Sequence, residues 1–161
     1  MRSIYPALVY TSMLFLCGLY SANIVLIVSN LLKQVKSQLE FMEMTEHLKM
    51  TWRAIMQDKN HHIIVKKLDG KIVSSCVCVI IPNLTRNIRP YAFIENVVTH
   101  SDYRGKGYAT ECLNYAKQIA ENTNCYKMML LTGSKKKEIL NFYGNARYNS
   151  TDKTAFIQWL E

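Results

Sequence analysis

The sequence lacks several features that would place it in a specialised class of protein. It has three prolines and six glycines in 161 residues, and no proline-rich, serine-rich or repeated stretch marks a linker or a solenoid. Its five cysteines include no Cys-x-x-Cys pair, and its four histidines are not spaced as zinc ligands. We therefore expect reduced, buried thiols, no metal site, and a cytoplasmic location.

Charge is missing from the N-terminal part of the chain. No charged residue occurs from Ile4 to Leu32, and a membrane-spanning helix needs roughly 20 apolar residues. Polar residues and a proline interrupt this run, which favours a buried strand over about residues 13–20 and an amphipathic helix over about 24–36. We expect a single domain over residues 13–161 after an extension of unknown role at residues 1–12. A membrane segment is the alternative.

Positive charge is in excess, with a formal net charge of +8. Such a balance suits an anionic partner: a nucleic acid, a phosphorylated cofactor or a membrane surface. The basic residues are spread out apart from Lys135–Lys137, and no helix is rich in arginine and asparagine like a recognition helix. We therefore expect no nucleic-acid partner.

Hydrophobic periodicity and turn residues predict the elements of the remaining chain. Helices are expected over about residues 45–57, 107–122 and 135–146, and strands over about 62–68, 72–81, 91–99, 126–132 and 154–160. Asp69-Gly70 is a tight-turn signal between the first two of these strands. With the N-terminal pair, the order is β-α-α-β-β-β-α-β-α-β. This order predicts an α/β fold with a mixed central sheet and helices on both faces.

A glycine-rich turn follows the strand expected over residues 91–99. The run Arg104-Gly105-Lys106-Gly107-Tyr108-Ala109 leads into a helix, whose first turn presents free N–H groups and the positive end of the helix dipole. Its two glycines allow positive φ and a close approach of an anion, and its arginine and lysine add positive charge. No Walker motif is present, and Thr110 stands where a G-x-G-x-x-G fingerprint needs its third glycine. The turn predicts a phosphate site without identifying the ligand.

The turn and the blocks around it resemble the GNAT superfamily of N-acetyltransferases. The turn resembles the pattern Arg/Gln-x-x-Gly-x-Gly/Ala, and Phe93–Val98 is similar to the strand that pairs with the pantetheine arm of the cofactor. Cys125–Leu131 and Asn141–Tyr143 are most similar to blocks of the glucosamine-6-phosphate N-acetyltransferase branch and its bacterial relatives. The resemblance covers about residues 13–160 and implies a GNAT fold and an acetyl-CoA-dependent transferase.

The resemblance also implies where acetyl-CoA, as co-substrate, would bind. Backbone groups at the end of one strand would bind the pantetheine amides, the turn would hold the pyrophosphate, and one helix residue would contact the arm near its thiol. These residues are, in that order, Val97, Val98 and Thr99; Arg104, Gly105, Lys106, Gly107, Tyr108, Ala109 and Thr110; and Asn141.

Two side chains are candidates for the chemistry of acetyl transfer. Glu95 is expected to share a strand face with Tyr91, Phe93 and Val97, and such apolar neighbours would raise its pKa towards that of a useful base. The resemblance implies a base that acts on the amine through water; the alternative is a partner for a nearby arginine. Tyr143 is protonated at neutral pH and could donate to the departing thiolate, the alternative being a core tyrosine. No Cys/His arrangement is evident, so direct attack by the amine is favoured over a cysteine nucleophile.

The acceptor is the least defined part of the prediction. Arg86 and Arg89 precede the Glu95 strand, and two arginines would suit an anionic acceptor such as an amino-sugar phosphate, although a solvated loop is the alternative. Arg147 departs from the superfamily, which has a glycine beyond this helix end. We expect an N-acetyltransferase acting on a primary amine of a small molecule, with a homodimer among the expected assemblies. The alternative is a catalytically weak acyl-CoA-binding or membrane-tethered module.

Overall fold

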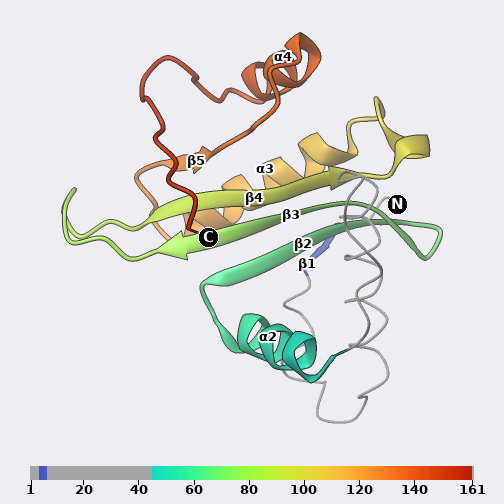
Figure 1. Cartoon of the computed structure of the whole chain (residues 1–161), viewed down its shortest axis with the longest axis horizontal. Coiled ribbons are helices and arrows are strands. Elements are labelled where there is room, and N and C mark those ends of the chain that lie inside the picture. Colours follow the sequence, from blue (N-terminus) through green and yellow to red (C-terminus); the bar gives the residue numbers. More distant parts are fainter. Residues whose placement is uncertain (1–3, 7–44, 161) are drawn as a thin grey trace.

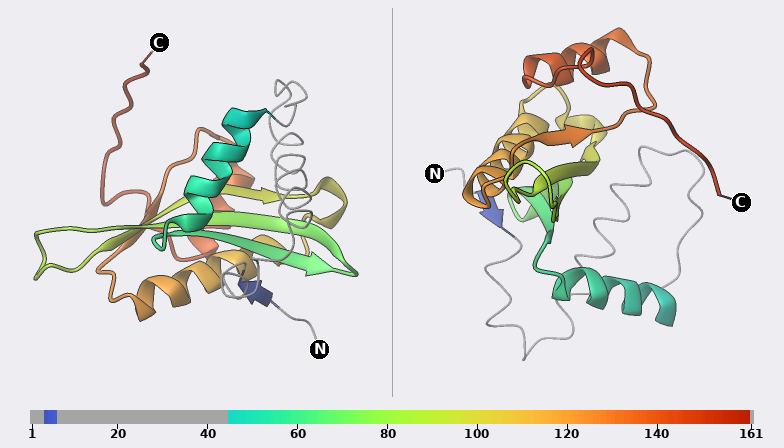
Figure 2. Two further views of the ribbon diagram at one scale, coloured as in Figure 1. Left: turned by 90° about the horizontal axis from the view of Figure 1, so that it is seen from below. Right: turned by 90° about the vertical axis from the view of Figure 1, so that its left-hand side faces the viewer.

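The computed structural model describes residues 4–6 and 45–160, which form a mixed sheet with helices against both of its faces (Figures 1 and 2). In chain order the described elements are β1 (Ile4–Pro6), α2 (Glu46–Gln57), β2 (His61–Leu68), β3 (Lys71–Ile81), β4 (Tyr91–Thr99), the 3₁₀ helix η3 (Ser101–Tyr103), α3 (Tyr108–Asn122), β5 (Met128–Leu130) and α4 (Lys137–Asn145). The α/β fold expected from the sequence is confirmed. The strand over 13–20 and the helix over 24–36 lie outside the described residues.

The sheet has the strand order β1-β2-β3-β4-β5 among the described residues. Neighbouring strands are antiparallel except β4 and β5, which are parallel. β1 belongs to the segment for which the sequence indicated no role, and it pairs with Ile64–Lys66 of β2. β2 and β3 are joined by Asp69 and Gly70, whose φ angles of 48° and 78° are those of a type I′ hairpin turn, as the sequence predicted.

The strand expected over residues 154–160 is not formed. These residues are irregular and exposed, and Phe156 and Trp159 are 92% and 82% exposed. Their apolar, strand-like pattern was the only signal for a strand. A strand also needs a neighbour whose backbone it can pair with, and the described part of the chain provides none here.

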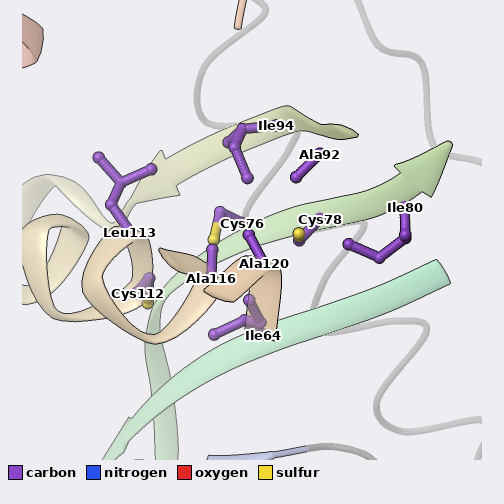
Figure 3. Close-up of a cluster of buried hydrophobic side chains, with 10 residues drawn as sticks. All are labelled: Ile64, Cys76, Cys78, Ile80, Ala92, Ile94, Cys112, Leu113, Ala116 and Ala120. Carbon is purple, nitrogen blue, oxygen red and sulfur yellow. The ribbon is translucent and has the colours of Figure 1, made fainter. Parts of the chain in front are cut away.

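Two apolar cores lie on opposite faces of the sheet. The core under α3 contains three buried free thiols, Cys76, Cys78 and Cys112, as the sequence predicted (Figure 3). Its other members are Ile64, Ile80, Ala92, Ile94, Leu113, Ala116 and Ala120. On the other face, Trp52 and Ile55 of α2 pack against a smaller core. α3 buries an apolar stripe and α2 contributes partly buried apolar side chains, so both faces of the sheet are covered.

A bulge interrupts β4 in its middle. Between the pairs Ser75–Val98 and Val77–Glu95, β4 has two residues where β3 has one. The first of the two, Asn96, has a φ of 52°, a left-handed conformation that asparagine tolerates better than most residues. The bulge ends the regular alternation of β4 just beyond Glu95.

The bulge reverses which residues of β4 face α3. Ile94 faces the α3 core before the bulge, whereas Val97 packs against that core after it and Val98 belongs to the α2 side. One extra residue moves every later side chain to the other face. The expectation that Glu95 and Val97 share a face is therefore wrong, because it assumed an uninterrupted strand.

Candidate active site

β4 and β5 separate after a short parallel contact. Their pairing is limited to Ala92–Ile94 with Met128–Leu130. β4 continues to Thr99, whereas the chain beyond β5 leaves the sheet (Figure 1). Within the described residues, the backbone groups on this side of β4 from Glu95 onward have no partner strand, so they are available to a ligand. The residues expected to bind pantetheine, 97–99, lie on this open edge.

A buried serine of β3 holds the end of β4 from the other side. Ser74 Oγ donates a hydrogen bond to the carbonyl oxygen of Val98 at 2.8 Å and lies 2.9 Å from Thr99 Oγ1. A serine hydroxyl has a single proton, so Thr99 must be the donor in the second contact. The end of β4 is thus fixed on its β3 side while its other edge stays open.

The glycine-rich turn has the backbone conformation that the sequence predicted. Gly105 and Gly107 have φ angles of 72° and 82°. Gly107 is the N-cap of α3 and supplies no side-chain hydrogen bond, so the first N–H groups of the helix lack a capping side chain. A Cβ added at either glycine would meet no atom within 4 Å. The positive φ is what requires glycine here, and the open space leaves room for an anion.

The two cations of the turn fold back onto it. Arg104 Nε donates to the carbonyl oxygen of Thr99 at 3.2 Å. Lys106 Nζ donates to the carbonyl oxygen of Asp102 at 2.9 Å and lies 5.1 Å from the centre of the Tyr103 ring. Both side chains are exposed. Their charges therefore lie beside the N-terminus of α3, where they would add to its attraction for phosphate.

Glu95 lies on β4 directly before the bulge and is exposed. The apolar surroundings expected for it are absent from the described part of the chain. Neither Arg86 nor Arg89 forms an ion pair with it among the described residues. A carboxylate at this place is open to water, so any proton that it accepts can reach it through the solvent.

Tyr143 lies on α4, half-buried against the core under α3. Burial is the main cause that raises the pKa of Tyr143, followed by the Cys76 thiol and the Glu95 carboxylate. The contribution of Glu95 means that the two catalytic candidates, 48 positions apart in the sequence, lie within electrostatic range of each other. With its pKa raised, Tyr143 keeps its proton at neutral pH and is a hydrogen-bond donor.

A Schellman motif at the end of α4 holds Tyr143 in place. The N–H of Tyr148 donates to the carbonyl of Tyr143 at 3.0 Å, and the N–H of Arg147 donates to that of Gly144 at 2.9 Å. The rings of Tyr143 and Tyr148 meet edge to face with centroids 6.1 Å apart. Arg147 has a φ of 67°, the conformation that normally favours glycine. The departure noted in the sequence is therefore accommodated, with backbone strain at Arg147.

A cleft of 710 Å³ lies between α3, the start of β5 and the end of α4. Lys117, Lys127 and Arg147 line it together with Glu121, so positive charge is in excess. Thr110 lines it too and connects it with the glycine-rich turn. The cleft therefore continues the anion-attracting surface of the turn along α3.

The arginines expected to bind the acceptor have different surroundings. Arg89 donates to the carbonyl oxygens of Asn124 and Cys125 at 3.1 and 3.0 Å, which ties the β3–β4 loop to the end of α3. Arg86 is exposed at the tip of the same loop. These contacts favour a structural role for Arg89. Asn141, expected near the cofactor thiol, is exposed on α4, two residues before Tyr143.

The sequence reasoning missed a buried cation, Lys66 of β2. Its side chain is 1% exposed and is paired with Glu111 of α3. The available signal was strand alternation, which places Lys66 on the same face as Ile64, a core residue.

Neither a membrane-spanning helix nor a metal centre is present in the described residues. None of the helices in residues 45–160 is long and apolar enough to cross a membrane. The same residues contain no group of three histidine, cysteine or acidic side chains arranged to hold a metal ion. The cytoplasmic location stays a prediction.

Comparison with known proteins identifies the family of the chain. Residues 28–146 match the model of the acetyltransferase (GNAT) family. The chain is 31% identical over 84 residues to glucosamine 6-phosphate N-acetyltransferase of Trypanosoma brucei brucei, a match over 52% of this chain and 55% of that protein. The chain thus spans about half the length of this curated relative.

Solved acetyltransferases share the fold. Glucosamine-6-phosphate N-acetyltransferase from Arabidopsis thaliana has a TM-score of 0.76 at 20% identity and covers 100% of this chain and 99% of its own. Aminoglycoside N-acetyltransferase AAC(6')-Iy, solved in complex with CoA, has a TM-score of 0.63 at 15% identity. The match covers 82% of this chain and 90% of that protein. At these identities the likeness is one of fold.

Replacement of Arg147 by glycine should stabilise the protein. We expect the free energy of unfolding to rise by about 1 kcal/mol, because an L-residue in the left-handed conformation costs roughly 1–2 kcal/mol and glycine adopts it freely. Urea denaturation measures the change. Arg147→Ala is the control, since it removes the same charge and side chain but keeps the Cβ. Equal stability of the two variants would show that the backbone conformation is not the cause.

Proposed function

The chain belongs to the acetyltransferase (GNAT) family, and we propose that it is an N-acetyltransferase that moves the acetyl group of acetyl-CoA to a primary amine of a small molecule by direct attack of the amine. The observation that carries this proposal is the open edge of β4 leading into a glycine-rich turn and an uncapped helix start. An amide-bearing arm followed by a pyrophosphate has the chemistry to fill these two features in that order.

The donor groups of the site fit acetyl-CoA. Val97, Val98 and Thr99 would pair their free backbone groups with the pantetheine amides, and the N–H groups of residues 104–110 would bind the pyrophosphate. Asn141 would contact the arm near the thiol. The cleft beyond Thr110, with its excess of positive charge, suits the nucleotide end of the cofactor. When bound, acetyl-CoA supplies the acetyl group as an activated thioester.

Glu95 and Tyr143 would divide the proton chemistry between them. Glu95 is exposed beside the bulge, so it would accept the proton of the amine through an intervening water. Tyr143 would donate a hydrogen bond to the sulfur as the thiolate leaves, because its raised pKa keeps it protonated. No protein nucleophile is needed: the buried Cys78, for instance, has its pKa raised to about 12 by burial and by the neighbouring Cys125.

The acceptor that we propose is an amine that also carries an anionic group, such as an amino-sugar phosphate. Arg86 is exposed on the loop before β4 and forms no ion pair among the described residues, so it would be the main contact with the anionic group of the acceptor. Arg89 would add to it only through the donors that Asn124 and Cys125 leave unused. The curated relative is named for glucosamine 6-phosphate, which has this chemistry.

Binding to the glycine-rich turn is tested by Gly107→Glu. A carboxylate at the start of α3 would fill the space proposed for the pyrophosphate and repel it, so we expect the dissociation constant for acetyl-CoA to rise by about a hundredfold or more in calorimetry. Gly70→Glu is a matched control, because Gly70 also has positive φ and lies in another turn. Unchanged binding in Gly107→Glu would overturn the assignment of the turn.

Turnover is tested by release of the CoA thiol with a panel of amines that includes glucosamine 6-phosphate. With an accepted amine, Tyr143→Phe should lower kcat by about 10²–10⁴-fold with little change in KM for acetyl-CoA, because it removes only the hydroxyl. Any fall of the wild-type rate through ionisation of Tyr143 should come at a higher pH than for an ordinary tyrosine, since burial raises its pKa from 10.0. Acetyl-CoA binding without release of thiol on any amine would instead favour the catalytically weak binding module.

We also propose a homodimer formed through the C-terminal segment. Phe156, Ile157, Trp159 and Leu160 are between 62% and 92% exposed, a density of large apolar side chains that usually marks a contact surface. Strand pairing with the outer edge of β5 in a second copy would cover them. Light scattering should give the mass of a dimer for the full chain and of a monomer after deletion of residues 154–160. A deletion variant that stays dimeric would contradict this interface.

A further inference from the structure

A buried lysine lies beneath the first turns of α3. Lys66 of β2 is the largest of the fully buried side chains among the described residues, at 1% exposure. Its ammonium contacts the carboxylate of Glu111 and lies 5.8 Å from the centre of the Tyr108 ring. A charge in the interior is costly unless a counter-charge accompanies it, so the contact with Glu111 is what makes this lysine tolerable.

Both partners of Lys66 belong to the start of α3. Tyr108 is the first residue of the helix and Glu111 the fourth, so they lie on one face, a turn apart. Tyr108 is buried as well, which places both contacts on the sheet side of the helix start. Lys66 therefore connects β2 with the helical turn whose N–H groups we assign to the pyrophosphate.

The pair lies in a polar layer rather than an apolar one. Ser74, opposite Lys66 in the β2–β3 register, is the residue that binds Val98 and Thr99 at the end of β4. Apolar side chains of similar volume commonly stabilise a fold as well as a buried ion pair does, or better. Stability alone therefore does not account for charges at this place. Their position under the first turn of α3, the helix start that we assign to the pyrophosphate, indicates a role in the site.

The charge of Glu111 indicates what that role is. A carboxylate in the first turn of a helix interacts favourably with the helix dipole, but it would repel a phosphate bound at the same terminus. Lys66, on the sheet side of the helix, compensates the negative charge of Glu111. We propose that Lys66 is a positioning residue for the cofactor, which anchors and neutralises Glu111 and so keeps the start of α3 attractive to pyrophosphate. This inference rests on the proposed assignment of acetyl-CoA to the turn.

The exposures of the two side chains determine which variants are informative. Glu111 is 32% exposed, so Lys66→Met leaves a carboxylate that water can still reach. Glu111→Gln alone would instead leave an unpaired ammonium in the interior, and it is a poor test. Lys66→Met/Glu111→Gln removes both charges and keeps both shapes, which makes it the matched control for the single variant.

The test is calorimetric titration with acetyl-CoA, after thermal melts have established that the variants are folded. For Lys66→Met we expect the dissociation constant to rise about tenfold, since one uncompensated charge near a helix terminus has an effect of that order. The double variant should return to within about twofold of the natural chain, because neither charge remains. The deficit of the single variant should shrink at high ionic strength, which a purely steric defect would not do.

Three outcomes would overturn the inference. The double variant could bind acetyl-CoA as weakly as Lys66→Met, or Lys66→Met could bind it as tightly as the natural chain. The third outcome is a loss of affinity in Lys66→Met that does not change with ionic strength. If Lys66→Met does not fold, Lys66→Met/Glu111→Lys replaces it. The variant Lys66→Met/Glu111→Lys has a cation at position 111 and should bind acetyl-CoA more tightly than Lys66→Met/Glu111→Gln. Equal binding by these two variants would refute the proposal. A natural chain that does not bind acetyl-CoA at all would refute the proposed function itself, a result distinct from these.

Discussion

β4 loses its parallel partner after three residue pairs, and the other parts of the site are arranged around this separation. A strand inside a sheet has its backbone groups satisfied on both sides, so it cannot bind a ligand through them. Here the side facing β3 is paired, and among the described residues the side facing β5 has no partner over the second half of the strand. The glycine-rich turn follows the end of β4 after the short helix η3, and the chain beyond β5 leads to α4. An extended ligand could therefore follow the edge from one to the other.

Three hydrogen bonds hold the end of β4 in place, where no described strand lies on its β5 side. Ser74 bonds to both Val98 and Thr99, and Arg104 bonds to Thr99 from the turn. The bulge at Asn96 has another effect, since it exchanges the faces of all later residues. Glu95 is left at the last position before that exchange, beside the place where β4 and β5 part. The strand thus presents a carboxylate and a free backbone edge within a few residues of each other.

Local sequence signals predicted most of the described helices, strands and turns. They failed where a feature depends on contacts between residues that are distant in the sequence. The Asp69-Gly70 turn, the positive φ of Gly107 and the stripe of α3 depend on nearby residues, so the sequence was sufficient to predict them. The bulge at Asn96 depends on the register between two strands, and nothing in the order of residues in β4 indicates it. The burial of Lys66 was not predicted, because its counter-charge, Glu111, is 45 positions away in the chain.

The surroundings of Tyr143 also limit the role that this residue can have in the reaction. An ordinary thiol has a pKa of about 8.5, well below that of a tyrosine whose pKa is raised from 10.0 by burial, by Cys76 and by Glu95. Complete transfer of the phenolic proton to a thiolate would therefore run uphill. A hydrogen bond to the sulfur has no such cost, and it stabilises charge that develops only as the bond to the acetyl group breaks. The Schellman motif and the ring of Tyr148 restrict the movement of Tyr143, which would suit this proposed role because a donor that needs no reorganisation stabilises a transition state best. The proton that finally neutralises the thiolate would then come from the amine, by way of water and Glu95.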